Sequence, residues 1–285
     1  MSLVRLIDNW NSYLQFLKSV PQQQINAELR LTGKLNNLFQ GVFAGILDEV
    51  NNYNRLPNRD ELAPVVNNYF NNIKEPYIEI LQEEAVEIGQ YGRNRIIHHL
   101  QASNVSIDYS DLSDNIVQLL NNNIFVASQQ TLERMTGDVM SVIGEGVSDG
   151  LGIREVAEML DSKFTGMQDY ELRRIARTEI NNYSNLSAVE TEKEFGVEYH
   201  QWITGDDDRV RGTNPNDEAD HTILHLQIVR IGDTFENGLL YPGDKSGELN
   251  QIINCRCRVV PFIMPHNKMA PINERYFFEE DLIAI

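Results

Sequence analysis

Along most of the chain, apolar positions recur every three or four residues, which is the spacing of amphipathic helices. Clusters of Asn and Asp, such as residues 51–58 and 103–114, separate these apolar stripes in the manner of loops. Each stripe is most simply explained by packing into an internal core. The stripes run over residues 35–50, 62–73, 77–91, 132–143, 153–160 and 172–183.

A second pattern begins near Gly196, where the apolar period changes from helical to alternating. The residues that lead to Trp202 alternate as in a strand, and residues 224–231 and 256–262 are further strand candidates. The passage Gly144–Gly152 predicts a boundary, because its four glycines disfavour a continuous helix. The predicted fold class is α+β, a mostly helical region followed by a small mixed domain. The predicted domains are residues 1–149 (helical), 150–265 (mixed α+β) and 266–285 (a C-terminal tail).

The composition narrows the class of protein. The net charge is −18 and the pI is about 4.7, so the chain as a whole repels bare nucleic acid at moderate salt. The apolar runs are shorter than a membrane span, and no signal peptide is evident, so we expect neither a membrane partner nor export. The acid excess with only seven lysines has two explanations that stay open, a halophilic host or an ordinary acidic protein.

The two cysteines of the chain, Cys255 and Cys257, are separated by one residue. On an extended chain this spacing points both sulfurs to one side, but it is poor geometry for a disulfide between them. Together with His221 they could form three corners of a structural zinc site, with His225 or Asp208 as the fourth ligand. The alternative is that both thiols are small apolar core residues, while the imidazole bonds a loop carbonyl.

Arg177 and Glu179 lie two positions apart on a predicted helix, so they face different directions. One interpretation pairs Arg177 with the acidic run Asp206–Asp208, and Glu179 with Arg209 or Arg211. A second interpretation makes Glu179 a general acid or base beside the imidazole at position 221. The third is a pair of structural ion pairs, which we favour because no nucleophile or phosphate-binding loop accompanies these residues.

Several short motifs in the last two fifths of the chain resemble, in their order and spacing, those of the Mu F-like minor head proteins of tailed viruses. This family also includes the SPP1-type head morphogenesis proteins. The similarity covers about Gly150 to Phe262, and one departure is Leu226, where the family usually has a glycine. The matching residues are Ala176-Arg177-Thr178-Glu179, Trp202, Asp208-Arg209-Val210-Arg211, His221, Tyr241-Pro242-Gly243-Asp244 and Asn254-Cys255-Arg256-Cys257.

The resemblance implies a minor capsid protein, located in the virion and made in the host cytoplasm, that acts in head assembly or genome delivery. It implies the portal protein, the major capsid protein or both as partners, with packaged DNA as a further candidate. It does not imply catalysis. The alternative function is an enzyme, a nuclease or an ADP-ribosyl transferase, that would use Glu179, His221 and Arg177.

Overall fold

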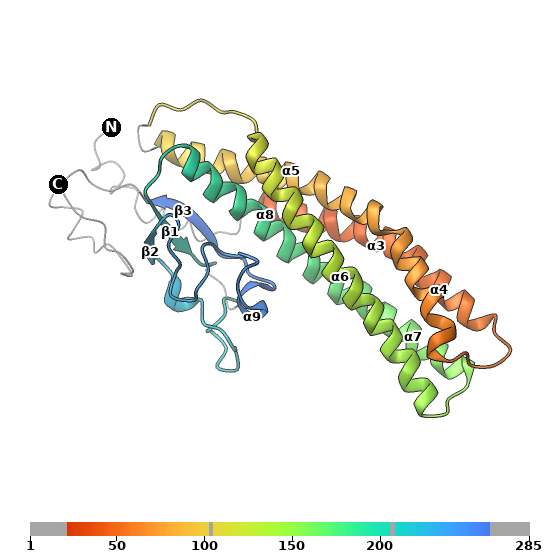
Figure 1. Cartoon of the computed structure of the whole chain (residues 1–285). Helices are drawn as coiled ribbons and strands as arrows, with labels where there is room; N and C mark the ends of the chain where they lie inside the picture. Colours follow the sequence, from red (N-terminus) through yellow and green to blue (C-terminus); the bar gives the residue numbers. More distant parts are fainter. Residues whose placement is uncertain (1–21, 103–104, 206–208, 263–285) are drawn as a thin grey trace. The chain divides into compact units, whose positions relative to one another are not determined.

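The computed structural model describes residues 22–102, 105–205 and 209–262. It is mostly helical and contains a small three-stranded antiparallel sheet (Figure 1), in agreement with the predicted α+β class. The helices are α3 (Gln22–Asn51), α4 (Arg59–Asn72), α5 (Lys74–Ala102), α6 (Asp114–Ser148), α7 (Ile153–Gly166), α8 (Leu172–Glu194) and the short α9 (Leu249–Ile252).

Each apolar stripe of the sequence coincides with one of these helices, with only Ile73 one residue beyond the end of α4, so the helix predictions are confirmed. The glycine-rich passage differs from expectation, because α6 continues through Gly146 and ends only at Ser148. A Cβ atom on Gly146 would lie 2.3 Å from Val156 of α7, so this glycine allows two helices to approach closely. The chain then turns at Gly150, which has a φ of 68°.

The chain forms two compact units, each assembled from separate stretches of sequence. We call Glu28–Glu84 with Asn121–Ala176 the helical unit, and Met1–Ala27, Ala85–Leu120 and Arg177–Ile285 the mixed unit. The division into residues 1–149, 150–265 and 266–285 stays a prediction about domain organisation.

The helical unit has an aromatic core. The ring of Phe39 lies 5.7 Å from Phe43, 6.3 Å from Phe70 and 5.8 Å from Tyr77, measured between centroids. Phe43 stacks in turn on Phe164 at 4.4 Å. Burying aromatic side chains of this size is a large favourable term that needs no directional bonds.

The sheet of the mixed unit has the strand order β2-β1-β3, with both pairings antiparallel. Its strands are β1 (Tyr199–Ile203), β2 (Ile228–Arg230) and β3 (Arg258–Phe262), so the three strand candidates are confirmed, although β2 is shorter than its candidate. The reason is that residues 222–224 form a 3-10 turn and Leu226 has a φ of 66°. Leu226 thus adopts a left-handed conformation that glycine takes more easily, at the position where the similar family usually has a glycine.

Within the mixed unit, α5 and α8 lie against each other through small residues. A Cβ atom on Gly92 would be 2.3 Å from the carbonyl oxygen of Ser184, and the Ser187 hydroxyl donates to the Gly89 carbonyl at 2.7 Å. Such a close approach leaves no space for a larger residue at position 92, and it brings the polar faces of the two helices into contact.

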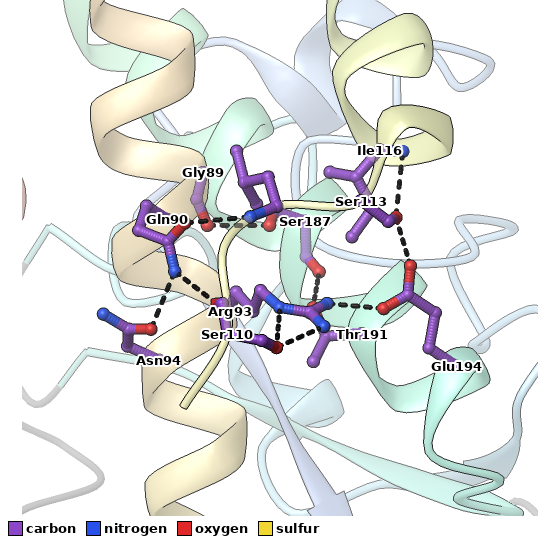
Figure 2. A network of polar contacts seen from close by, with 11 residues as sticks. Gly89, Gln90, Arg93, Asn94, Ser110, Ser113, Ile116, Ser187, Thr191 and Glu194 are labelled. Atoms are coloured by element: carbon purple, nitrogen blue, oxygen red, sulfur yellow. Dashed lines mark hydrogen bonds and ion pairs between the residues drawn. The ribbon is translucent and has the colours of Figure 1, made fainter. Parts of the chain in front are cut away.

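Arg93 extends this contact into a polar network (Figure 2). Its guanidinium group lies 2.5 Å from Glu194 of α8 and 2.9 Å from the hydroxyl of Ser110, in the loop before α6. Ser113 contacts the same Glu194 carboxylate and accepts from the backbone NH of Ile116. The network therefore fixes the loop and the start of α6 to α8.

Candidate functional site

Helix α8 buries a row of polar side chains that face the C-terminal part of the chain. The amide of Asn185 donates to the carbonyl oxygens of Pro242 at 3.1 Å and of Cys257 at 3.0 Å, and its oxygen accepts from the backbone NH of Val259 at 3.2 Å. Asn182 donates to the carbonyl of Gly243 at 2.7 Å. A single helix thus satisfies backbone groups of a turn, of the cysteine tract and of β3, which buried backbone requires.

Tyr241 to Asp244 form a tight turn closed by a bond of 3.1 Å from the NH of Asp244 to the carbonyl of Tyr241. Pro242 and Gly243, with a φ of 86°, supply the residue types that a type II turn requires at its two central positions. The turn is buried, and a Cβ atom on Gly243 would lie 3.3 Å from Asn182. Glycine is needed here both for its conformation and for the close approach to α8.

The cysteine tract is held by the Ala-Arg-Thr-Glu segment of α8. Asn254 has a φ of 61°, a conformation that Asn tolerates better than most residues. Its NH donates to the hydroxyl of Thr178 at 3.1 Å, and its side-chain oxygen accepts from Arg177 at 3.3 Å. These bonds fix the start of the cysteine tract, which leads into β3.

His221, Cys255 and Cys257 come together as the sequence predicts. The imidazole Nδ1 lies 3.7 Å from the sulfur of Cys255 and 3.5 Å from that of Cys257, and the three ligand atoms lie within 4.8 Å of one another. All three residues are buried, so the cysteines occupy the core and also meet the histidine. This cluster could bind a metal ion, since two thiols and an imidazole are a suitable set of ligands.

The orientation of His221 suits metal binding. Its backbone NH donates to the carbonyl of Arg211 at 2.9 Å, and its Nε2 lies 2.9 Å from the side-chain oxygen of Gln251. A carbonyl partner places the proton on Nε2, which leaves the Nδ1 lone pair directed at the two sulfurs. The alternative hypothesis had this imidazole bonded to a loop carbonyl, whereas its Nε2 partner is the side chain of Gln251.

The two thiols influence each other. Hydrogen bonding from Cys257 and the nearby His221 hold the pKa of Cys255 well below its usual range. Burial and the neighbouring Cys255 raise the pKa of Cys257 well above its usual range. The two pKa shifts are opposite in direction, and a bound metal ion would stabilise the thiolate form of both cysteines.

Aromatic side chains surround this cluster. Trp202 is fully buried, and its ring centroid lies 5.4 Å from that of His221 and 5.0 Å from that of Phe235. The ring of His200 stacks on Phe235 at 5.2 Å, and its Nδ1 lies 3.1 Å from the buried carboxylate of Glu192. The sequence analysis missed this buried Glu192–His200 pair.

A cavity of about 280 Å³ opens beside the cluster. It reaches all three residues of the cluster, and arginines contribute much of its remaining wall. Arg211 also donates to the backbone carbonyls of Gln251 and Ile253, which ties the loop before His221 to α9 and the residue after it. The lining residues are Arg177, Gly205, Arg209, Val210, Arg211, Asp217, His221, Asn254, Cys255, Arg256 and Cys257.

Other predicted partners are placed differently. Glu179 pairs with Lys245 at 2.5 Å rather than with Arg209 or Arg211, and it does not line the cavity. His225 lies 2.9 Å from the hydroxyl of Thr204 and does not join the cluster, so it is not the fourth ligand. Asp208, like the rest of the run at 206–208, lies outside the described residues.

Comparisons of the chain with protein-family models, with curated proteins and with solved structures gave no match. None of the helices in the described part of the chain has the length and apolar character that a membrane crossing requires.

Proposed function

We propose that the chain is a minor head protein of a tailed virus, and that a zinc ion on His221, Cys255 and Cys257 stabilises its mixed unit. The observation that supports both proposals is the convergence of the short motifs in one compact unit. The Arg-Thr pair at 177–178 bonds Asn254, Asn185 bonds both the turn and the cysteine tract, and the cysteines meet the histidine. Contact among these motifs is what we expect if they form one module of the kind that the resemblance implies.

The proposed role of the zinc is structural in the first place. The strands of the mixed unit are short, and the loop that carries His221 contains little apolar surface. A metal bound by this loop and by the cysteine tract that precedes β3 would cross-link segments far apart in sequence. The helices would then provide the surface that meets the portal or the major capsid protein, which is the docking role that the resemblance implies.

The geometry supports an enzymatic function less well than a structural metal site. The catalytic hypothesis needs Glu179 and His221 within hydrogen-bond reach in one pocket. Instead, Glu179 is paired with Lys245, and both His221 ring nitrogens have partners within the site.

The test of the viral role is the composition of purified virions. We expect mass spectrometry to detect this chain in fewer copies than the major capsid protein, and deletion of its gene to reduce the yield of infectious particles. Complementation with the wild-type chain should restore the yield. A chain found only in the host cytoplasm and never in particles would refute the proposal.

The test of the zinc is elemental analysis of the purified protein. We expect about one zinc per chain, and a lower melting temperature after treatment with a chelator. Cys257→Ser should lose the metal and melt like the chelated wild type. A matched control is Ser128→Ala, at a buried position of the helical unit, which should keep the metal. A metal-free protein whose melting temperature is unchanged by chelator would refute the zinc site.

A further inference from the structure

The histidine and the two cysteines are one ligand short of the four that a closed zinc site uses. In the parts of the chain that the structure describes, no other His, Cys, Asp or Glu joins them. Zinc sites with three protein ligands keep a fourth position for water or for an exogenous ligand. The surroundings of that position therefore decide what else the site can bind.

The surroundings are cationic. The cavity that reaches all three ligands is also lined by Arg177, Arg209, Arg211 and Arg256. Its acidic lining residue, Asp217, accepts bonds from the backbone NH groups of residues 212 and 214, at 2.8 Å and 3.3 Å, which offset part of its charge. Among the described residues, four guanidinium groups and one carboxylate line the cavity, so a bound metal ion would make the site strongly positive in a chain whose net charge is −18.

We infer that this cavity binds a phosphate group, one oxygen of which occupies the fourth position of the metal. The inference rests on the proposed zinc site. A phosphate monoester carries up to two negative charges, and its several oxygens can meet a metal and arginine NH groups at the same time. The cavity of about 280 Å³ has room for such a group with several waters, given about 30 Å³ per water in the liquid.

The grouping of the arginines around one cavity and the net charge of the chain favour a terminal or free phosphate over the backbone of a duplex. A duplex presents a row of phosphates to an extended basic surface. Here the arginines surround one cavity, and the excess of acidic residues elsewhere opposes a long polyanion. The phosphate could come from inorganic phosphate or from the 5′ end of a nucleic acid, and these two sources are distinguished by experiment.

The experiment replaces zinc by cobalt in the purified full-length protein, because the visible spectrum of cobalt bound by thiolates reports its fourth ligand. We expect inorganic phosphate at low millimolar concentration to shift the visible bands, and sodium chloride at equal ionic strength to leave them unchanged. A short single-stranded oligonucleotide with a 5′ phosphate, compared with the same strand without it, tests the second source.

Two arginine variants locate the phosphate. Arg256→Gln and Arg209→Gln should each weaken phosphate binding about tenfold, the factor expected when a charge-assisted hydrogen bond is lost. Arg154→Gln is the matched control, because Arg154 lies on α7 with its side chain 91% exposed and paired with Glu158. It should bind phosphate as the wild type does.

The outcomes separate this inference from the zinc proposal. If the protein binds no metal, the zinc proposal fails and the inference fails with it. If cobalt binds but its spectrum does not respond to phosphate, the inference alone is refuted. The same conclusion follows if Asp208→Asn changes the cobalt spectrum in the absence of phosphate, since a protein carboxylate would then complete the coordination.

Discussion

The two units of this protein have interiors of opposite character. The helical unit packs Phe39, Phe43, Phe70, Tyr77 and Phe164 against one another. The mixed unit buries, along a single helix, a series of amides, hydroxyls and carboxylates. The buried polar residues of α8 are Glu179, Asn181, Asn182, Ser184, Asn185, Ser187, Thr191 and Glu192.

The difference shows that the two units depend on different features of the sequence. An aromatic core is stabilised by the area it removes from water, so another apolar residue of similar size retains most of that free energy. A buried amide is stabilised by particular donors and acceptors, and replacing it by an apolar residue leaves its former partners unsatisfied. The mixed unit should therefore be far less tolerant of substitutions that conserve size.

The largest effect should follow from Asn185→Leu, which keeps the approximate volume and removes every side-chain hydrogen bond. Two backbone carbonyls and one backbone NH would lose their partner, at a cost of about 3–5 kcal/mol in the free energy of unfolding. Urea denaturation followed by Trp202 fluorescence, in a Trp10→Phe background, would measure it. The matched control, Asn68→Leu at an exposed position of α4, should change stability by less than about 0.5 kcal/mol.

Arg93→Met should be the second most damaging change. The substitution removes the guanidinium group from the network in Figure 2, so the Glu194 carboxylate loses its ion-pair partner. We expect the free energy of unfolding to fall by about 2–3 kcal/mol. The control is Arg154→Met, where an exposed pair with Glu158 is removed at almost no cost. Equal stabilities of the two variants in urea would show that the network contributes nothing to the mixed unit.

Acid should act on the mixed unit through His99. Burial, together with Arg95 and then His98, lowers the pKa of His99 from 6.5 to about 4. The unfolded chain therefore binds this proton more readily, and stability contributed above pH 6.5 is lost as the pH falls towards 4. We expect His99→Gln to remove about 1–2 kcal/mol of this dependence between pH 6.5 and 4. Urea unfolding of the wild type and of His99→Gln at several pH values would measure this difference. A chelator in all samples removes any contribution of bound metal. Identical dependence of stability on pH in the two proteins would contradict the prediction.

The smallest effect should be that of Phe39→Leu in the helical unit. The substitution keeps an apolar side chain, so we expect a loss of about 1–1.5 kcal/mol, measured by helical circular dichroism during urea unfolding. Phe39→Asn is the sharper companion, because an amide without partners in this core should cost several times as much. If Phe39→Leu proved as damaging as Asn185→Leu, the contrast between the two interiors would be wrong.

The helices, the strands and the cluster of His221, Cys255 and Cys257 could be predicted from the sequence, for clear reasons. Apolar periodicity reports burial directly, and two cysteines at a spacing of two can only face one side of an extended chain. His221 could be identified because few residue types bind metal. It is also the histidine that follows the Asp-Arg-Val-Arg motif in the order that the similar family shows. The helices and strands depend on local sequence patterns, and the cluster depends on residue types that are rare in this chain.

The polar interior of the mixed unit could not be predicted in the same way. Asn182 and Asn185 are residues typical of surfaces and loops, and only the fold shows that they satisfy the buried turn and the cysteine tract. The run Asn181-Asn182-Tyr183-Ser184-Asn185, unusually polar for a helix that continues well beyond it, was the one available indication. Likewise, the charges of Glu179 and Lys245 allow many pairings, and the choice depends on tertiary structure.

The discontinuous make-up of the two units has a consequence for the order in which they fold during synthesis. The helical unit is complete in sequence once Ala176 has left the ribosome. The mixed unit must wait for β3, about 80 residues later, and at 5–20 residues per second that interval lasts several seconds. Throughout that time the amide-rich half of α8 lacks the turn and strand that it will bind, and we expect its polar side chains to be hydrated by water in the nascent chain.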